Sequence, residues 1–265
     1  MATASEARPT GVGSVQPGSL PGGVPPLRGG QGHSFLLRRL HSLSGIVPVG
    51  AFLLEHFVSN SFATNGPESY INQVKFLTGL PFALWLEIFG IYLPILFHAG
   101  YGFYIWKRGD ANLGGAYPWT GNWMYTLQRW SGIVAFAYII YHTGYMRFSG
   151  IHLFDHPDAA FWKVQNEFRS TLAIAVYAVG IASASWHFGY GLFLFAAKWG
   201  LVVGDVARER MKKVGIAIAL LLMMVGLMTI KAFVAPKADW PRQEFKPEWS
   251  LPGHSSTTLE TESPR

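Results

Sequence analysis

The chain has 265 residues, of which 50% are apolar and only 14% are charged, against about 25% in an ordinary soluble domain. This composition excludes a disordered chain and fits a soluble enzyme poorly, and the net charge of +6 comes without the long Lys/Arg block that favours nucleic-acid binding. The sequence has no cysteine, which excludes disulfides, iron–sulfur clusters, thiolate zinc sites and covalently attached haem in this chain. Any metal or cofactor must therefore be held by histidine, carboxylate or methionine.

Residues 1–33 are rich in Gly, Pro and Ser and carry almost no bulky apolar side chains. Such a composition cannot build a core, so we expect a disordered N-terminal arm. The arm also lacks the apolar region of a secretory signal.

Five apolar segments follow, each long enough to cross a bilayer, which takes about 20 residues. They are approximately residues 35–58, 81–106, 123–146, 171–199 and 214–234. Because a backbone in hydrocarbon must satisfy its own hydrogen bonds, each segment is predicted to be a helix. Pro48 and Pro94 fall inside the first and second helices, where we expect kinks. The sequence therefore predicts an all-α integral membrane protein with five transmembrane helices in residues 34–234.

Residues 235–265 are polar and contain five prolines, which indicates an extended C-terminal tail. Trp240 and Trp249 in this tail are candidates for contact with the membrane interface or with a partner subunit.

Positive charges gather before the first helix, after the second, and between the fourth and fifth. They are Arg28, Arg38, Arg39, Lys107, Arg108, Lys198, Arg208, Arg210, Lys212 and Lys213. The opposite loops hold only Lys75, Arg147, Lys163 and Arg169. Because positive loops face the cytoplasm, the N-terminus is predicted inside and the C-terminus outside.

Four histidines lie well inside apolar segments, one in each of the first four predicted helices. They are His56, His98, His142 and His187, at spacings of 42, 44 and 45 residues. An ionisable side chain inside a membrane is costly and indicates function.

Depth sorts these histidines into two pairs. At the helical rise per residue, His56 and His142 lie roughly 30 and 25 Å beyond the cytoplasmic ends of their helices. His98 and His187 lie only about 13–18 Å from those ends. Two histidines from two helices at one depth are what b-type haem ligation requires. We therefore expect the first four helices to form a haem-binding bundle, with His98 and His187 as an inner pair and His56 and His142 as an outer pair.

A weak internal repeat accompanies the histidines. His98 and His187 each begin a His-x-Gly-Tyr-Gly sequence, and His142 begins His-Thr-Gly-Tyr. Ser-Gly-Ile-Val occurs at 44–47 and again at 131–134. Glycine near a ligand lets a flat macrocycle approach the backbone. The alternative is coincidence, with the histidines serving as hydrogen-bonded packing residues.

Several stretches resemble the cytochrome b558-type, di-haem membrane subunit family of succinate:quinone oxidoreductase and fumarate reductase. They are Arg38 to Gly50 (RRLHSLSGIVPVG), Glu55-His56-Phe57, Leu86-Glu87-Ile88-Phe89 with Leu93-Pro94 and His98, and Arg129-Trp130-Ser131-Gly132 leading to His142. The resemblance spans about residues 35–234. It implies five helices, two haems b, a quinone site with menaquinone favoured, and a flavoprotein and an iron–sulfur subunit on the cytoplasmic face of a bacterial inner membrane.

The resemblance also assigns ligands. It makes the inner pair the ligands of the haem proximal to the iron–sulfur subunit and the outer pair those of the distal haem. Lys198 matches a basic residue near a haem propionate. Arg39 and Arg129 are further candidates for a propionate, against ordinary positive flanking, and His41 and Ser42 for the haem edge.

Two carboxylates, Glu55 and Glu87, lie within the predicted helices. Quinone chemistry needs a nearby proton carrier, for which a buried carboxyl is suited. Glu87 lies deeper and is the candidate, with a hydrogen bond to a neighbouring helix as the alternative role. For Glu55 an interfacial role is favoured.

Other interpretations remain open. His152, Asp155, His156 and Asp158 could chelate zinc, although a solvated loop is favoured. The whole chain could also be a haem-free membrane anchor, a proton-coupled transporter with a histidine relay, or a di-haem subunit of another dehydrogenase. Within the resembled family, succinate oxidation and quinol:fumarate reduction share one architecture.

Overall fold

The computed structural model describes residues 30–108 and 120–250, and every regular element within these ranges is a helix. This confirms the predicted all-α class for the described part of the chain. The chain divides into two units, residues 1–36 and 37–265, and the four candidate ligand histidines lie in the second. The predicted arm up to residue 29 and the predicted tail beyond residue 250 lie outside the described residues.

The first predicted span consists of two helices, α1 (Gly30–Ile46) and α2 (Pro48–Ser61). They meet at Val47, directly before Pro48, where a kink was expected. Proline has no N–H and its ring clashes with the carbonyl four residues earlier, so the regular helix is interrupted here. Val47 is still bonded to both helices, because its amide donates to the Leu43 carbonyl at 2.9 Å and its carbonyl accepts from the Ala51 amide at 3.2 Å.

The second predicted span contains α4 (Ala83–Trp85), the π-helical segment η2 (Leu86–Tyr92) and α5 (Leu93–Lys107). The wider π turn directly precedes Pro94, whose ring would otherwise press on the carbonyl four residues before it. Phe82, which precedes α4, has a φ of 61°, a strained value for an aromatic residue. No residue from Ala83 to Lys107 is buried, so this segment packs only loosely against the rest of the chain.

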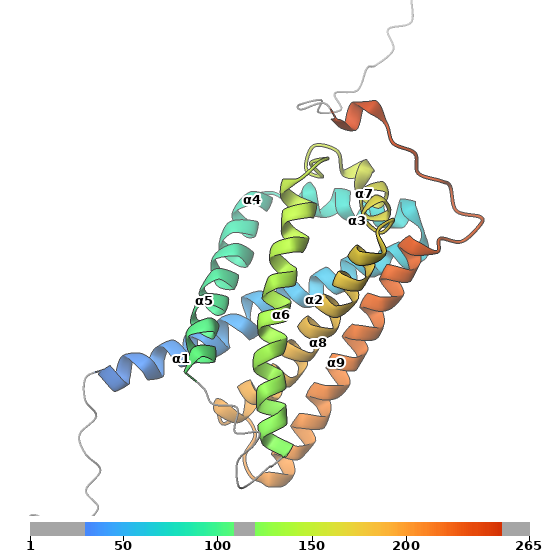
Figure 1. The fold of residues 1–265 in the computed structure, drawn as a ribbon. Coiled ribbons are helices and arrows are strands. Elements are labelled where there is room, and N and C mark those ends of the chain that lie inside the picture. The colour runs from blue at the N-terminus through green and yellow to red at the C-terminus, as the bar shows by residue number, and fades with distance from the viewer. Residues whose placement is uncertain (1–29, 109–119, 251–265) are drawn as a thin grey trace, which may run out of the picture. The chain divides into compact units, whose positions relative to one another are not determined.

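The remaining spans are α6 (Thr120–Phe148), α8 (Thr171–Lys198) and α9 (Asp205–Val234). Figure 1 shows them side by side, with α8 in contact with both neighbours. The α8–α9 packing is closest at Gly189 and Gly215, where a Cβ on either residue would lie 2.4 Å from the other's carbonyl oxygen. Glycine at both positions is therefore what lets these two helices touch.

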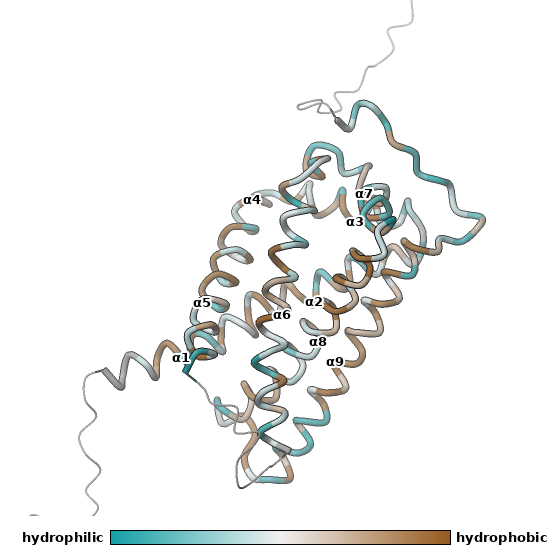
Figure 2. The backbone as a smooth tube through the Cα atoms, in the orientation of Figure 1, coloured by the Kyte–Doolittle hydropathy of each residue, from teal (hydrophilic) through white to brown (hydrophobic). Residues whose placement is uncertain are grey.

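Four of the five expected spans are helices long and apolar enough to cross a membrane: Ser34–Asn65, Ala83–Lys107, Thr171–Lys198 and Asp205–Val234. Helix α6 does not meet that criterion, although its 29 residues would extend roughly 43 Å. Its many Tyr, Trp and Gly residues lower its hydropathy, and in Figure 2 it is visibly less apolar than α9. The fifth spanning helix remains a prediction.

Two short helices that were not predicted, α3 (Pro67–Thr78) and α7 (Ala160–Glu167), pack together at one end of the bundle (Figure 1). We call them the helical cap. The largest buried cluster of the described residues lies beneath them. It contains Ala63, Tyr70, Ile71, Ala160, Phe161, Val164, Phe168, Tyr177, Ile230, Ala232 and Phe233. The best-packed core is therefore at this end and not in the middle of the spans.

The described part of the tail packs on the helical cap. After α9 the chain is extended up to η4 (Pro247–Ser250), and Trp240 packs against the core beneath the cap. Trp249 is only 3% exposed, contacts Ile151 and Ala159, and donates its indole N–H to Asp158 at 2.9 Å. Both tryptophans thus contact their own chain.

Candidate functional site

The inner pair comes together between α5 and α8. The ring centres of His98 and His187 lie 6.1 Å apart, and the ring planes are almost perpendicular at 84°. The helices carrying them are far apart in sequence, so this contact is a product of the fold.

Backbone carbonyls orient both rings of the inner pair. His98 Nδ1 lies 2.9 Å from the carbonyl oxygen of His41, and His187 Nδ1 lies 2.9 Å from that of Gln128. A carbonyl oxygen can only accept, so each Nδ1 carries a hydrogen and donates it. Each Nε2 is then left with its lone pair, which is the arrangement that metal-ligating histidines adopt.

The Ser-Gly-Ile-Val repeat has a geometric role at this pair. A Cβ on Gly45 would lie 2.3 Å from Cε1 of His98, and a Cβ on Gly132 would lie 2.6 Å from Cε1 of His187. Real contacts of this kind are about 3.5–4 Å, so both positions need glycine. The glycine of each repeat therefore leaves room for an imidazole ring, which the sequence alone did not indicate.

The outer pair joins α2 and α6. The ring centres of His56 and His142 lie 5.6 Å apart at an interplanar angle of 77°. His142 Nδ1 lies 3.2 Å from the Tyr177 hydroxyl, and the Phe52 ring lies 5.3 Å from the His56 ring. The two histidines of each predicted pair are thus neighbours in the structure.

The spacing of both pairs fits a shared metal atom. Two rings that each bind a metal through one nitrogen at about 2 Å have centres about 6 Å apart. With two protein ligands a metal needs the rest of its ligand set from a macrocycle, as in haem. Over residues 30–108 and 120–250 no group of three or more His, Asp or Glu could hold a metal ion by itself, which includes the region of His152 and His156.

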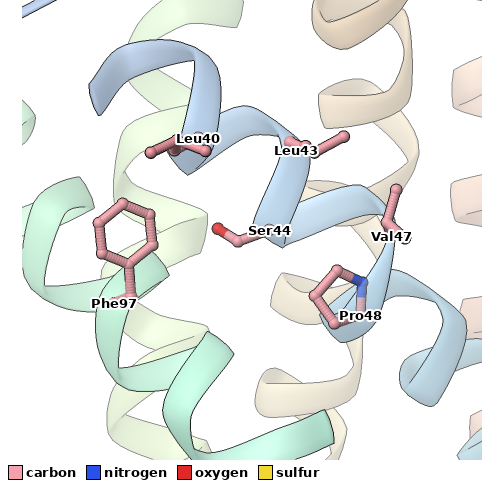
Figure 3. A pocket seen from close by; sticks show the side chains of 6 residues that line it. All are labelled: Leu40, Leu43, Ser44, Val47, Pro48 and Phe97. Atoms are coloured by element: carbon pink, nitrogen blue, oxygen red, sulfur yellow. The ribbon is translucent and has the colours of Figure 1, made fainter. Parts of the chain in front are cut away.

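An apolar pocket of about 440 Å³ lies along α1 and the start of α2, with Phe97 of α5 at one side (Figure 3). It is lined by Leu40, Leu43, Ser44, Val47, Pro48 and Phe97. Its lining can accept the apolar edge of a flat ligand.

Several of the predicted propionate and haem-edge residues meet where α8 ends. Lys198 Nζ donates to the Arg38 carbonyl at 2.7 Å, and the Arg39 guanidinium lies 4.8 Å from the centre of the Trp199 ring. Ser42 Oγ accepts from the Trp199 indole at 3.1 Å. These contacts join the middle of α1 to the end of α8.

Two other predicted residues are placed differently. The His41 ring is stacked on His98 at 4.1 Å, and its Nδ1 is buried without a hydrogen-bond partner. Arg129 lies on α6 over the Tyr125 ring at 5.1 Å.

Glu87 lies on η2 and is paired with α6. Its Oε1 accepts from Arg147 Nε at 3.0 Å and from the Tyr92 hydroxyl at 3.4 Å, while Oε2 is buried without a partner. The hydrogen bond to a neighbouring helix, which was one of the two predicted roles, is present, and its partner Arg147 was not predicted. Glu55 is exposed and accepts a hydrogen bond from Ser59 on its own helix.

The comparison with known proteins decides the family. The chain is 38% identical over 200 residues to the succinate dehydrogenase cytochrome b558 subunit of Bacillus subtilis (strain 168), which covers 97% of that protein and 76% of this chain. The chain belongs to the succinate dehydrogenase cytochrome b558 subunit family. No family model matches it. Membership in the cytochrome b558 family confirms the resemblance that the Arg38 to Gly50 stretch indicated.

Proposed function

We propose that this protein is the membrane-anchor cytochrome b subunit of a succinate:quinone oxidoreductase and passes electrons between an iron–sulfur subunit and membrane quinone. The observation that carries the proposal is the presence of two histidine pairs with similar ring spacings, 5.6 and 6.1 Å, in a chain of the cytochrome b558 family. Each pair would hold one haem b, which supplies reversible one-electron transfer when bound.

The residues of this chain would hold and orient these groups. His98 and His187 would bind through Nε2, because their Nδ1 hydrogens are engaged by backbone carbonyls. His56 and His142 would bind the distal haem. Lys198, Arg39 and Arg129 would neutralise propionates by charge-assisted hydrogen bonds, and His41 and Ser42 would contact the edge of the proximal haem.

Glu87 is the proposed proton carrier for quinone. Its Oε2 supports this role, because that oxygen is buried without a partner and can exchange a proton while Arg147 holds Oε1. We expect Glu87→Gln to reduce quinone-linked turnover at least tenfold with both haems retained, whereas Glu68→Gln, an exposed carboxylate on α3, leaves turnover unchanged. Equal turnover in the two variants would refute the role of Glu87.

The partners follow from what this chain lacks. Without cysteine it cannot hold iron–sulfur clusters, so succinate chemistry belongs to a flavoprotein and an iron–sulfur subunit. By the positive-inside rule we expect the N-terminus inside, the C-terminus outside and α6 as the fifth span. The proposed partners would then bind on the cytoplasmic face of a bacterial inner membrane, as the family resemblance implies. Menaquinone is the favoured quinone and succinate oxidation the proposed direction.

Reduction by substrate tests this proposal in the assembled complex. Added succinate should reduce both haems, and His187→Ala should remove the proximal haem and slow reduction of the distal one by orders of magnitude. Haems that dithionite reduces and succinate leaves oxidised would contradict the electron path. A chain without haem would instead be an anchor or a proton-coupled transporter.

A further inference from the structure

Glu167 is a buried carboxylate at the outer-pair end that the proposed function does not use. It is the last residue of α7 and is only 8% exposed. Its Oε1 accepts a hydrogen bond from the Tyr141 hydroxyl, and the Tyr145 hydroxyl lies within hydrogen-bonding reach of the same carboxylate. Burying a carboxylate costs free energy unless the carboxylate is hydrogen-bonded. Here the donors are the hydroxyls of Tyr141 and Tyr145 on α6.

Tyr177 connects this carboxylate electrostatically with the outer pair. Tyr177 is 4% exposed, and its hydroxyl oxygen lies 3.2 Å from His142 Nδ1. When His142 binds through Nε2, its Nδ1 hydrogen is donated to the Tyr177 oxygen. The hydroxyl hydrogen of Tyr177 must then turn to another acceptor. Phe168, which follows Glu167 in the chain, packs against the Tyr177 ring with the ring centres 4.8 Å apart. The Tyr141 ring, whose hydroxyl donates to Glu167, lies 6.2 Å from the Tyr177 ring. Glu167 is thus a carboxylate in the immediate surroundings of Tyr177.

We propose that Glu167 is a positioning residue for the outer histidine pair and acts through Tyr177. The negative carboxylate turns the Tyr177 dipole so that its oxygen faces His142. This arrangement strengthens the hydrogen bond from Nδ1 and makes the imidazole a more basic ligand. A more basic ligand favours the oxidised metal, so Glu167 lowers the reduction potential at the outer pair through this hydrogen bond. The inference rests on the proposed function, because it presupposes a haem at this pair.

The test is a redox titration of both haems in the purified complex, with Glu167→Gln, Tyr177→Phe and the double variant. We expect Glu167→Gln to favour reduction at the outer pair about tenfold, which is 59 mV for one electron, with the inner potential unchanged. Tyr177→Phe should shift the outer potential in the same direction, and adding Glu167→Gln to it should have no further effect. Glu68→Gln removes an exposed charge of the helical cap and should leave both potentials unchanged.

Several results would overturn this proposal. An unshifted outer potential in Glu167→Gln, equal shifts at both haems, or an equal shift in Glu68→Gln would each show that Glu167 has no specific connection with the outer pair. An undiminished Glu167→Gln effect in the Tyr177→Phe background would exclude Tyr177 as the connection. Tyr177→Phe keeps the ring, so an unshifted potential in it refutes the proposal even where Glu167→Gln fails to assemble. Absence of haem absorbance in the parent complex would refute the proposed function itself.

Discussion

Adding one methyl group at each glycine of the Ser-Gly-Ile-Val repeat should remove the proximal haem. The Cβ of Gly45→Ala would lie 2.3 Å from His98, and that of Gly132→Ala 2.6 Å from His187. An ordinary contact needs about 3.5–4 Å, so each ring must withdraw by roughly 1 Å. Metal–ligand distances tolerate only about 0.2 Å, so the nitrogen would leave bonding range. We expect the affinity for the proximal haem to fall by at least roughly 10–100-fold, which is the loss typical when a ligand is no longer held in its orientation.

Gly132→Ala gives the stricter test of this prediction. His187 belongs to α8, which is held between α6 and α9, whereas the segment carrying His98 has no buried residue and can move away. Gly90→Ala is the control, because Gly90 lies outside both repeats and a Cβ there meets nothing within 4 Å. Haem content per chain, measured by pyridine haemochrome, should drop in the repeat variants and stay unchanged in the control. Full proximal haem in Gly132→Ala would refute the reasoning.

Three further predictions concern the stability of the fold. Lys163 donates to the carbonyls of three residues at the end of α6, so Lys163→Met should lower the free energy of unfolding by about 1–3 kcal/mol; an unchanged melting temperature would contradict this. Trp249→Ala should release the tail from the helical cap, detected as faster proteolysis between residues 235 and 250 with the spans intact; equal cleavage rates would contradict it. Gly189→Ala should force α8 and α9 apart and destabilise the protein more than Gly100→Ala. Differential scanning calorimetry of the two purified variants should therefore give the lower melting temperature for Gly189→Ala.

Four of the five spans could be predicted because their apolar runs are long enough, whereas the hydropathy of α6 is too low to decide whether it crosses the membrane. The α1–α2 junction follows from Pro48, whose missing N–H interrupts a helix in any context. The helical cap could not be predicted in this way, because α3 and α7 are short and polar enough to pass for loops. Their burial depends on packing against each other and against Trp240, which is far away in sequence.

The histidine pairs were predictable from depth alone, since one rise per residue applies to every helix. Their surroundings were not, because hydrogen-bond partners come from other helices. Gln128 and Tyr177 each hold a histidine ring from a neighbouring helix, and no spacing in the sequence indicates either contact. Glu167 was overlooked because it lies between two predicted spans, where a carboxylate is normally solvated. Tyr138, Tyr141 and Tyr145, spaced three and four residues apart along α6, are the sequence signal that would have pointed to it.

The haem content of the complex purified with its partners tests the central claim most directly. The dithionite-reduced minus oxidised spectrum, quantified as pyridine haemochrome, should give two low-spin haems b per chain, with one lost in His187→Ala and the other in His142→Ala. A complex without haem, or two haems retained in both variants, would contradict the assignment of the histidine pairs.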